Sequence, residues 1–207
     1  MRAGRVLSRV LLLALLAAAA LLARPYAERL VRMVRLVTAD PPARLPMPVA
    51  APPEAVADTW RAPRSGGRVH QGVDIFAPRG TPVLSTTEGL VVNVGENALG
   101  GRTVMVLGPG GQRHYYAHLD RYGGFDEGDW VEAGAVIGHV GSTGNAAAGA
   151  PHLHYGIYDG GEAIDPLPLL RAEAEVPGWP SRGGAGALTD ERLRPRISLC
   201  AGQAPGS

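Results

Sequence analysis

The region 58–170 is divided into short β-branched segments separated by turn residues, a pattern that leaves little room for anything but β-structure. The segments are "TPVLST", "GLVVNVG", "RTVMVLG", "RHYYAHL", "WVEAGAVIGHVG" and "HLHYGIY". Turn signals such as "GPGG" (108–111) and "YDGG" (158–161) lie between them. Glycine (29 residues) and proline (18) are abundant, which disfavours a helical bundle. We therefore predict an all-β domain, either an antiparallel sandwich or a partly open barrel.

The N-terminus carries a basic and apolar signal that is separate from the β-rich region. Arginines at positions 2, 5 and 9 precede the apolar run "VLLLALLAAAALLA" (10–23). A basic start with a run of this length is typical of a secretory signal, and the run is shorter than the roughly 17–25 residues that span a bilayer comfortably. Residues 27–37 then show helical periodicity. We predict that 1–38 is a signal peptide or an N-terminal hydrophobic helix that anchors the chain, with a basic amphipathic segment.

The arginines after the apolar run oppose this interpretation. Arg24, Arg29, Arg32 and Arg35 follow it, and positive charge there disfavours translocation of that flank. The alternative is a buried apolar helix of a cytosolic protein. We nevertheless expect export, to the periplasm or cell envelope, because the run has a basic start and a linker behind it.

Composition divides the rest of the chain. Residues 39–57 hold six prolines and little periodicity, which predicts a semi-rigid extended linker before the domain at 58–170. Residues 171–207 are predicted to be a flexible tail. They include the only cysteine, Cys200, so an internal disulfide and a cysteine-rich metal site are excluded. The net charge of +1 gives no case for a nucleic-acid partner.

Two pairs of polar residues indicate either a polar, half-exposed strand face or a metal or catalytic site. His152 and His154 are two apart on a predicted strand, so they point to the same face. His70 and Asp74 are evenly spaced in an extended segment and also share a side. Two histidines and an aspartate are ordinary zinc ligands, and three protein ligands with an open position are typical of catalytic zinc. The candidate set is His70, Asp74 and one of the 152/154 pair.

The remaining histidines are less informative alone. His114 and His118 are also evenly spaced, which fits a polar strand face or a histidine bonded to a tyrosine. His139, in "IGHVG", is predicted to be a solvated strand histidine.

Taken together, the motifs resemble the lysostaphin-type (LytM-like) peptidoglycan metallopeptidases. The resemblance covers about residues 58–170 and matches in order and spacing. It consists of "HQGVD" (70–74), "APRGTPV" (77–83), "YAHL" (116–119), "GDWVEAGAVIGHVGSTG" (128–144), "HLH" (152–154) and "IDPLPLL" (164–170). It implies the duplicated hybrid β-motif of that family. It also implies that zinc is bound by His70, Asp74 and His154, with His118 and His152 flanking the metal-bound water.

The implied chemistry is hydrolysis of an amide. Zinc polarises the carbonyl and lowers the pKa of bound water to about 7. His118 and His152 would orient the water, take its proton or stabilise the oxyanion, and which does which is left open. Some relatives are latent because an upstream asparagine fills the fourth metal position. Asparagine occurs here only at 93, 97 and 145, so that form of latency is not expected.

We therefore expect a zinc endopeptidase that cuts peptide cross-links of bacterial peptidoglycan, with stem peptides as partners and the membrane as a second partner if the N-terminal segment is uncleaved. One alternative is a non-catalytic module of the same fold that activates another wall hydrolase; such regulators typically lack some of the five positions. Another is a carrier domain, since "GDWVEAGAVIGHVGSTG" resembles biotinyl and lipoyl domains. Those two carriers need a modified lysine, and this chain has none. Sugar-phosphotransferase domains share the signature and need a phosphorylated histidine instead, but they would not need an exported N-terminus.

Overall fold

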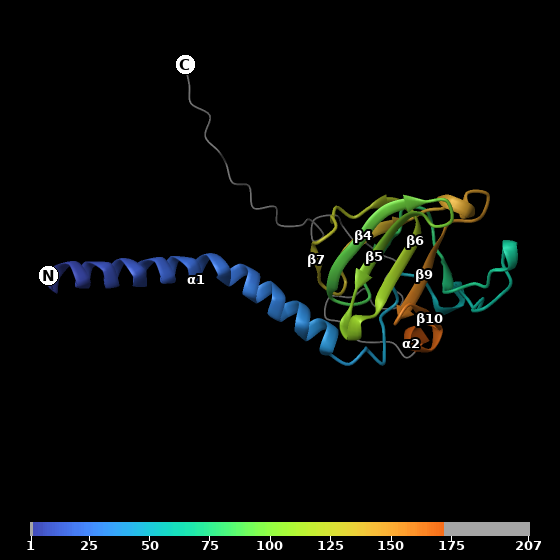
Figure 1. The fold of residues 1–207 in the computed structure, drawn as a ribbon. Coiled ribbons are helices and arrows are strands. Elements are labelled where there is room, and N and C mark those ends of the chain that lie inside the picture. The colour runs from blue at the N-terminus through green and yellow to red at the C-terminus, as the bar shows by residue number, and fades with distance from the viewer. Residues whose placement is uncertain (1, 172–207) are drawn as a thin grey trace, which may run out of the picture.

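A long N-terminal helix and ten antiparallel strands make up the described part of the chain, residues 2–171, in this computed structural model (Figure 1). The strands are β1 (Val56–Ala57), β2 (Val73–Phe76), β3 (Pro82–Leu84), β4 (Gly89–Asn97), β5 (Gly101–Leu107), β6 (Arg113–Tyr122), β7 (Trp130–Val131), β8 (Val136–Val140), β9 (His152–Asp159) and β10 (Glu162–Ile164). The helices are α1 (Arg2–Thr38), α2 (Leu167–Arg171) and the short 3₁₀ turns η1 (Pro53–Ala55), η2 (Ser65–Gly67), η3 (Pro109–Gly111) and η4 (Gly144–Ala146).

The strands form one sheet with the order β1-β2-β9-β6-β5-β4-β7. β10 pairs with β9, and β8 joins β6 to β3. All these pairings are antiparallel, as short segments joined by tight turns favour. The predicted all-β antiparallel fold with an N-terminal apolar helix is thereby confirmed.

Strands β2 and β9 show how the sheet separates core from site. In β2, Val73 and Ile75 are fully buried, and in β9 Leu153 and Tyr155 are too. Because strand side chains alternate, the residues between them point to the opposite face. That face carries the polar residues of both strands.

The segment predicted as a linker, 39–57, is extended but packed. Leu45, Met47 and Val49 belong to the hydrophobic core and are at most 9% exposed. Val49 also bridges to Val83 of β3. The core of the β-rich region therefore includes side chains that precede residue 58. Most of the predicted tail, 172–207, and with it Cys200, lies outside the described residues.

Helix α1 has an exposed half and a docked half. By length and composition, Leu11–Thr38 is the one helix in residues 11–171 that could cross a membrane. Leucines such as Leu22, 73% exposed, contact nothing in the described chain that would cover them. α1 changes direction along its length in Figure 1, and Pro25 lies inside it, where the missing N–H and the ring disrupt the helix.

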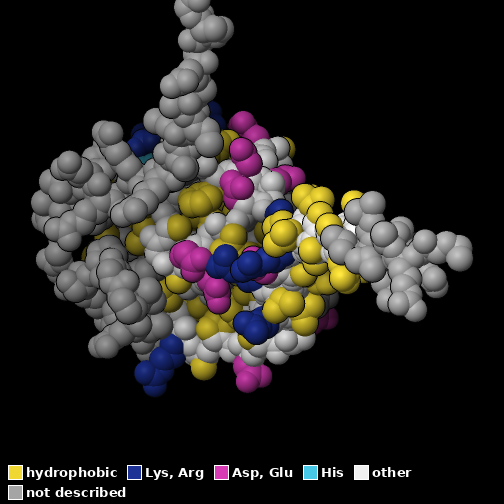
Figure 2. All heavy atoms as spheres, turned by 90° about the vertical axis from the view of Figure 1, so that its left-hand side faces the viewer, with side chains coloured by type: hydrophobic (Ala, Val, Ile, Leu, Met, Phe, Trp, Pro, Cys, Tyr) yellow, Lys and Arg dark blue, Asp and Glu magenta, His cyan; other side chains and the backbone are white. Residues whose placement is uncertain are grey.

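The docked half contacts β7 and its flanking loops. Leu36 is only 4% exposed. The Arg32 guanidinium lies 3.8 Å from the centre of the Trp130 ring and 2.6 Å from a carboxylate oxygen of Glu132. Figure 2 looks along α1 at this face and shows arginine and acidic side chains next to one another. The end of α1 is thus attached to the domain by apolar and charged contacts.

Candidate metal centre and active site

The pairing of β2 with β9 brings together residues that are far apart in sequence. Asp74 lies opposite His154, and Phe76 lies opposite His152. Side chains of directly opposed residues are neighbours on one face of an antiparallel pair. The sheet face therefore carries Asp74 and both histidines of "HLH" side by side.

The third predicted ligand, His70, lies just before β2 and is held by Thr59. Its Nδ1 is 3.0 Å from the Thr59 carbonyl oxygen. A carbonyl can only accept, so Nδ1 carries the proton and Nε2 is free to face the site. Gly72 is also required, because a Cβ there would lie 2.8 Å from the His154 ring and would collide with the Tyr155 carbonyl.

His70, Asp74 and His154 form a possible metal site. Nε2 of His70 is 2.8 Å from Nδ1 of His154, and each nitrogen is 3.1 Å from Oδ1 of Asp74. All three ligand atoms lie within 4.8 Å of one another. Two imidazole nitrogens and one carboxylate oxygen that converge in this way fit zinc, which takes such ligands at about 2.0–2.2 Å.

The electrostatics keep these groups in the forms that bind cations. Burial alone would raise the pKa of Asp74, but hydrogen bonding with His154 and the close contact with His70 hold it well below its usual range. Burial lowers the pKa of His154 despite the opposing effect of Asp74. At neutral pH the site therefore presents an ionised carboxylate and a neutral imidazole, as metal binding requires.

His118 reaches the site through an irregularity in β6. Along the β5–β6 pair, Arg102 opposes Leu119 but Val104 opposes Tyr116, so Ala117 and His118 together face one residue of β5. This is a β-bulge, which shifts the alternation of side chains. His118 has a φ of +62°, unusual for a residue with a side chain.

The loops around the bulge hold His118 in this conformation. Its backbone N–H donates to the Gly100 carbonyl at 2.7 Å, and its Nδ1 is 2.9 Å from the Thr143 carbonyl. The Thr143 hydroxyl donates to the Leu119 carbonyl and accepts from the Arg102 N–H, both at 2.9 Å. These contacts fix the direction of the His118 ring.

His118 and His152 face one another beside the three-residue cluster. Their ring centres are 4.9 Å apart, and Nε2 of His152 is 3.9 Å from Oδ1 of Asp74. Nδ1 of His152 is 2.9 Å from the Ala150 carbonyl, so each neutral ring has its proton on Nδ1 and a lone pair on Nε2. Burial, opposed by the hydrogen bond to Thr143, lowers the pKa of His118 to about 4. A neutral His118 can therefore accept a proton at Nε2.

The other two histidines lie elsewhere. His114 is fully buried in the core, where its Nδ1 is 2.7 Å from the Tyr155 hydroxyl. It is thus bonded to a tyrosine, one of the two alternatives that its sequence left open. His139 lies on β8 opposite Pro82 and Arg121, away from the cluster.

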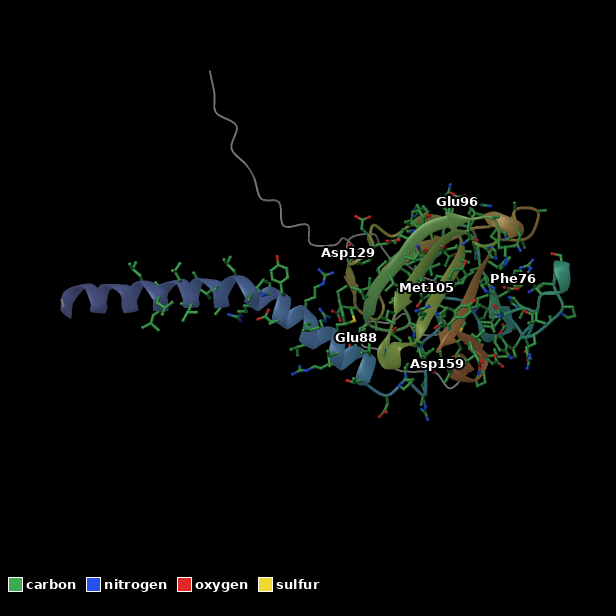
Figure 3. The ribbon with its side chains drawn as sticks, in the orientation of Figure 1. Phe76, Glu88, Glu96, Met105, Asp129 and Asp159 are labelled. Atoms are coloured by element: carbon green, nitrogen blue, oxygen red, sulfur yellow. The ribbon has the colours of Figure 1, made fainter. Side chains whose placement is uncertain are left out.

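The five residues of the site lie in a cleft of about 770 Å³. Its walls come from residues 64–71, from the loops at 97–100 and 145–150, and from the site faces of β2, β5, β6 and β9. Phe76, whose ring centre is 5.2 Å from that of His152, lies on the side of the domain away from α1 (Figure 3). Glu88, by contrast, lies beside α1 in the same view.

Sequence motifs did not indicate the residues that support the site. Thr59 holds His70, Arg64 pairs with Asp74 at 2.9 Å, and Thr143 holds His118. Thr143 lies within the long motif at 128–144, but Thr59 and Arg64 belong to no motif.

Part of the chain that includes most of the site matches a known protein family. Residues 68–166 match the model of peptidase family M23. The chain is 44% identical over 126 residues to an L-Ala–D-Glu endopeptidase of Bacillus subtilis, covering 55% of this chain and 39% of that protein. It is 38% identical over 112 residues to lysostaphin of Staphylococcus simulans, covering 51% and 22%. The chain thus spans less than half of the length of either protein.

A solved structure covers the same region more completely. The catalytic domain of the antimicrobial peptidase lysostaphin from Staphylococcus simulans superposes with a TM-score of 0.51 at 35% identity. The match covers 91% of that domain and 56% of this chain. The resemblance to lysostaphin-type peptidases is confirmed, and the chain belongs to peptidase family M23.

Proposed function

We propose that this chain is a zinc-dependent endopeptidase that hydrolyses peptide cross-links in bacterial peptidoglycan. The observation that carries the proposal is the convergence of His70, Asp74 and His154 in a cleft, with His118 and His152 beside them. Membership of a peptidase family and likeness to an L-Ala–D-Glu endopeptidase support it. A bond to a D-amino acid is characteristic of peptidoglycan stem peptides.

Zinc would be held by Nε2 of His70, Oδ1 of Asp74 and Nδ1 of His154, and would supply Lewis acidity to a carbonyl and to water at neutral pH. The peptide would bind in the cleft that contains this cluster. His118 and His152 present Nε2 lone pairs to the same space, so either can accept the proton of the attacking water and return it to the leaving amine. The ring that has taken this proton can also donate a hydrogen bond to the developing oxyanion before it passes the proton on.

We further propose that the domain lies outside the cytoplasmic membrane and that α1 is a signal or anchor. The basic start and the uncovered apolar half of α1 support this. In the folded chain two of the arginines after the run have acidic partners, since Arg24 lies 2.7 Å from Glu28 and Arg32 lies 2.6 Å from Glu132. These side chains serve contacts within the protein.

Digestion of purified sacculi tests the enzymatic proposal. The full chain, solubilised in detergent and loaded with zinc, is expected to release soluble peptides, and mass spectrometry of the products identifies the bond cut. His70→Ala and Asp74→Ala should lose zinc and all release. A wild-type chain that binds zinc but releases nothing from sacculi of several wall chemistries would favour the hydrolase-activator alternative.

A further inference from the structure

The segment between β1 and His70 contacts two of the three candidate ligands. Residues 59–69, called the arm here, form a short hairpin closed by a bridge between Pro63 and Val69 and by an Arg64 N–H to Arg68 carbonyl bond of 2.9 Å. Its start, Thr59, holds His70. Nearer its tip, Arg64 donates a hydrogen bond to Asp74.

The two oxygens of the Asp74 carboxylate have different partners. Nη2 of Arg64 donates to Oδ2 at 2.9 Å, while Oδ1 faces His70 and His154 at 3.1 Å each. One oxygen is thus occupied by the arm and the other is turned to the cluster. The Asp74 side chain is only 13% exposed, so water cannot take over from Arg64 freely.

We propose that Arg64 is a positioning residue that strengthens zinc binding by holding Asp74 with Oδ1 toward the metal position. The inference rests on the proposed zinc site. A ligating carboxylate with a fixed partner on its second oxygen loses less freedom when it binds, and removal of such partners typically weakens metal affinity by about 10–100-fold.

The positive charge of Arg64 acts in the opposite direction. A guanidinium near a divalent cation repels it, so if charge were all that mattered, loss of Arg64 would leave zinc affinity unchanged or raise it. The sign of the change therefore separates the two effects. Arg68 provides the matched control, because it lies on the same arm and lines the same cleft but bonds to Ser65 instead of a ligand.

The test compares zinc affinity of the detergent-solubilised full chain with that of Arg64→Ala, Arg64→Gln and Arg68→Ala, by competition with a chromogenic chelator. We expect both Arg64 variants to bind zinc at least about tenfold more weakly, and Arg68→Ala to stay within about threefold of wild type. Thermal melts of the metal-free variants verify that each is folded, and two different substitutions guard against a folding defect in one.

Equal or tighter zinc binding in the folded Arg64 variants would overturn the inference. So would a rise in KM for sacculus fragments at unchanged zinc affinity, because Arg64 would then contact substrate instead. A wild-type chain that binds no zinc would refute the proposed function, whereas a zinc-loaded, active wild type with zinc-competent Arg64 variants would refute this inference alone.

Discussion

At the scale of single residues, backbone carbonyls determine which ring nitrogen carries the proton in three of the four histidines of the site. Nδ1 of His70, His118 and His152 each faces a carbonyl oxygen, so each of these rings turns Nε2 to the site. His154 is the exception, since its Nδ1 faces Asp74. The tautomers of His70, His118 and His152 are therefore fixed by the chain itself before any ligand arrives.

Removal of either flanking imidazole is expected to abolish most hydrolysis without loss of zinc. A positioned acid–base group contributes about 10²–10⁴-fold, so His118→Ala and His152→Ala should each lower turnover on sacculi by at least about 100-fold. Zinc content measured in parallel should stay at the wild-type level. His139→Ala, which lies away from the cluster, is the control and should keep full activity. A near-normal rate in either variant would remove that histidine from the mechanism.

The buried His114 is expected to make the fold sensitive to acid. Burial lowers the pKa of His114 from 6.5 to about 4. Between these values the unfolded chain binds the proton and the folded chain does not, so the free energy of unfolding falls as the pH drops from about 6.5 to about 4. The contribution is fully present above pH 6.5, and its loss amounts to about 3 kcal/mol.

Urea unfolding of the metal-free chain at pH 7.5 and pH 4.5 measures this effect. His114→Asn keeps a hydrogen-bonding group for Tyr155 but does not titrate, so its stability should fall less with pH than that of the wild type, by about 2–3 kcal/mol. Parallel pH dependences in the two proteins would show that His114 is not the source.

At the scale of elements, the β-bulge in β6 explains what sequence spacing could and could not predict. Even spacing correctly suggested that His152 and His154 share a face, because β9 is regular there and pairs with β2 throughout. His114 and His118 are also evenly spaced, but the bulge at 117–118 lies between them, so their side chains point to different faces. His114 points into the core and His118 into the cleft.

The conformation of His118 and the packing of residues 39–57 could not be predicted from local sequence, because both depend on distant segments. Resemblance placed His118 near the metal, but no local pattern marks a bulge that depends on Gly100 and Thr143, which lie on other segments. Composition likewise predicted an extended chain at 39–57 but not that Leu45 and Val49 enter the core. Such contacts depend on partners far along the chain.

The bulge is expected to depend on the Thr143 hydroxyl. Thr143→Val keeps the shape of the side chain but removes the bonds to Leu119 and Arg102. A part-buried N–H left without a partner costs about 1–3 kcal/mol, so the free energy of unfolding should fall by that amount. Thr81→Val, which removes an exposed hydroxyl contact with Pro78, should cost less in the same denaturation assay. Equal losses in both variants would contradict this role for Thr143.

The docking of α1 should depend more on Leu36 than on Arg32. Leu36 is 4% exposed, and truncation of a buried leucine typically costs about 2–5 kcal/mol. The side chains of Arg32 and Glu132 are 46% and 71% exposed, and such surface pairs contribute at most about 1 kcal/mol. The contact of Arg32 with the Trp130 ring adds only about 0.5–1 kcal/mol. Limited proteolysis after Thr38 should therefore accelerate more in Leu36→Ala than in Arg32→Ala. The reverse order would show that charge holds the helix.

At the scale of the whole molecule, the apolar half of α1 and the cleft lie on opposite sides of the domain. α1 meets the domain beside Glu88, whereas Phe76 and the cleft lie on the far side (Figure 3). Under the proposal that α1 is an anchor, its packing against the domain would restrict how the domain can turn relative to the membrane. If α1 stays in the bilayer, the cleft opens away from the membrane toward the wall.

A reporter enzyme fused after Ser207 tests the placement of the domain. A reporter that works only outside the cytoplasm, such as a disulfide-dependent phosphatase, should be active in the fusion and lose activity when residues 2–23 are deleted. The physical reason is that deletion removes both the basic start and the apolar run. Activity of a cytosol-only reporter in the same position would refute export.

The joining of β2 to β9 also has a consequence in time. His70 and His154 are 84 positions apart, and a ribosome that adds about 5–20 residues each second makes that stretch in roughly 4–17 seconds. Until β9 has been made and has paired, His70 and Asp74 have no third ligand beside them. A chain that has not yet been extended past β9, or that is threaded unfolded through a membrane, therefore cannot assemble the candidate metal centre, and the hydrolase activity proposed for it would arise only where the domain completes its folding.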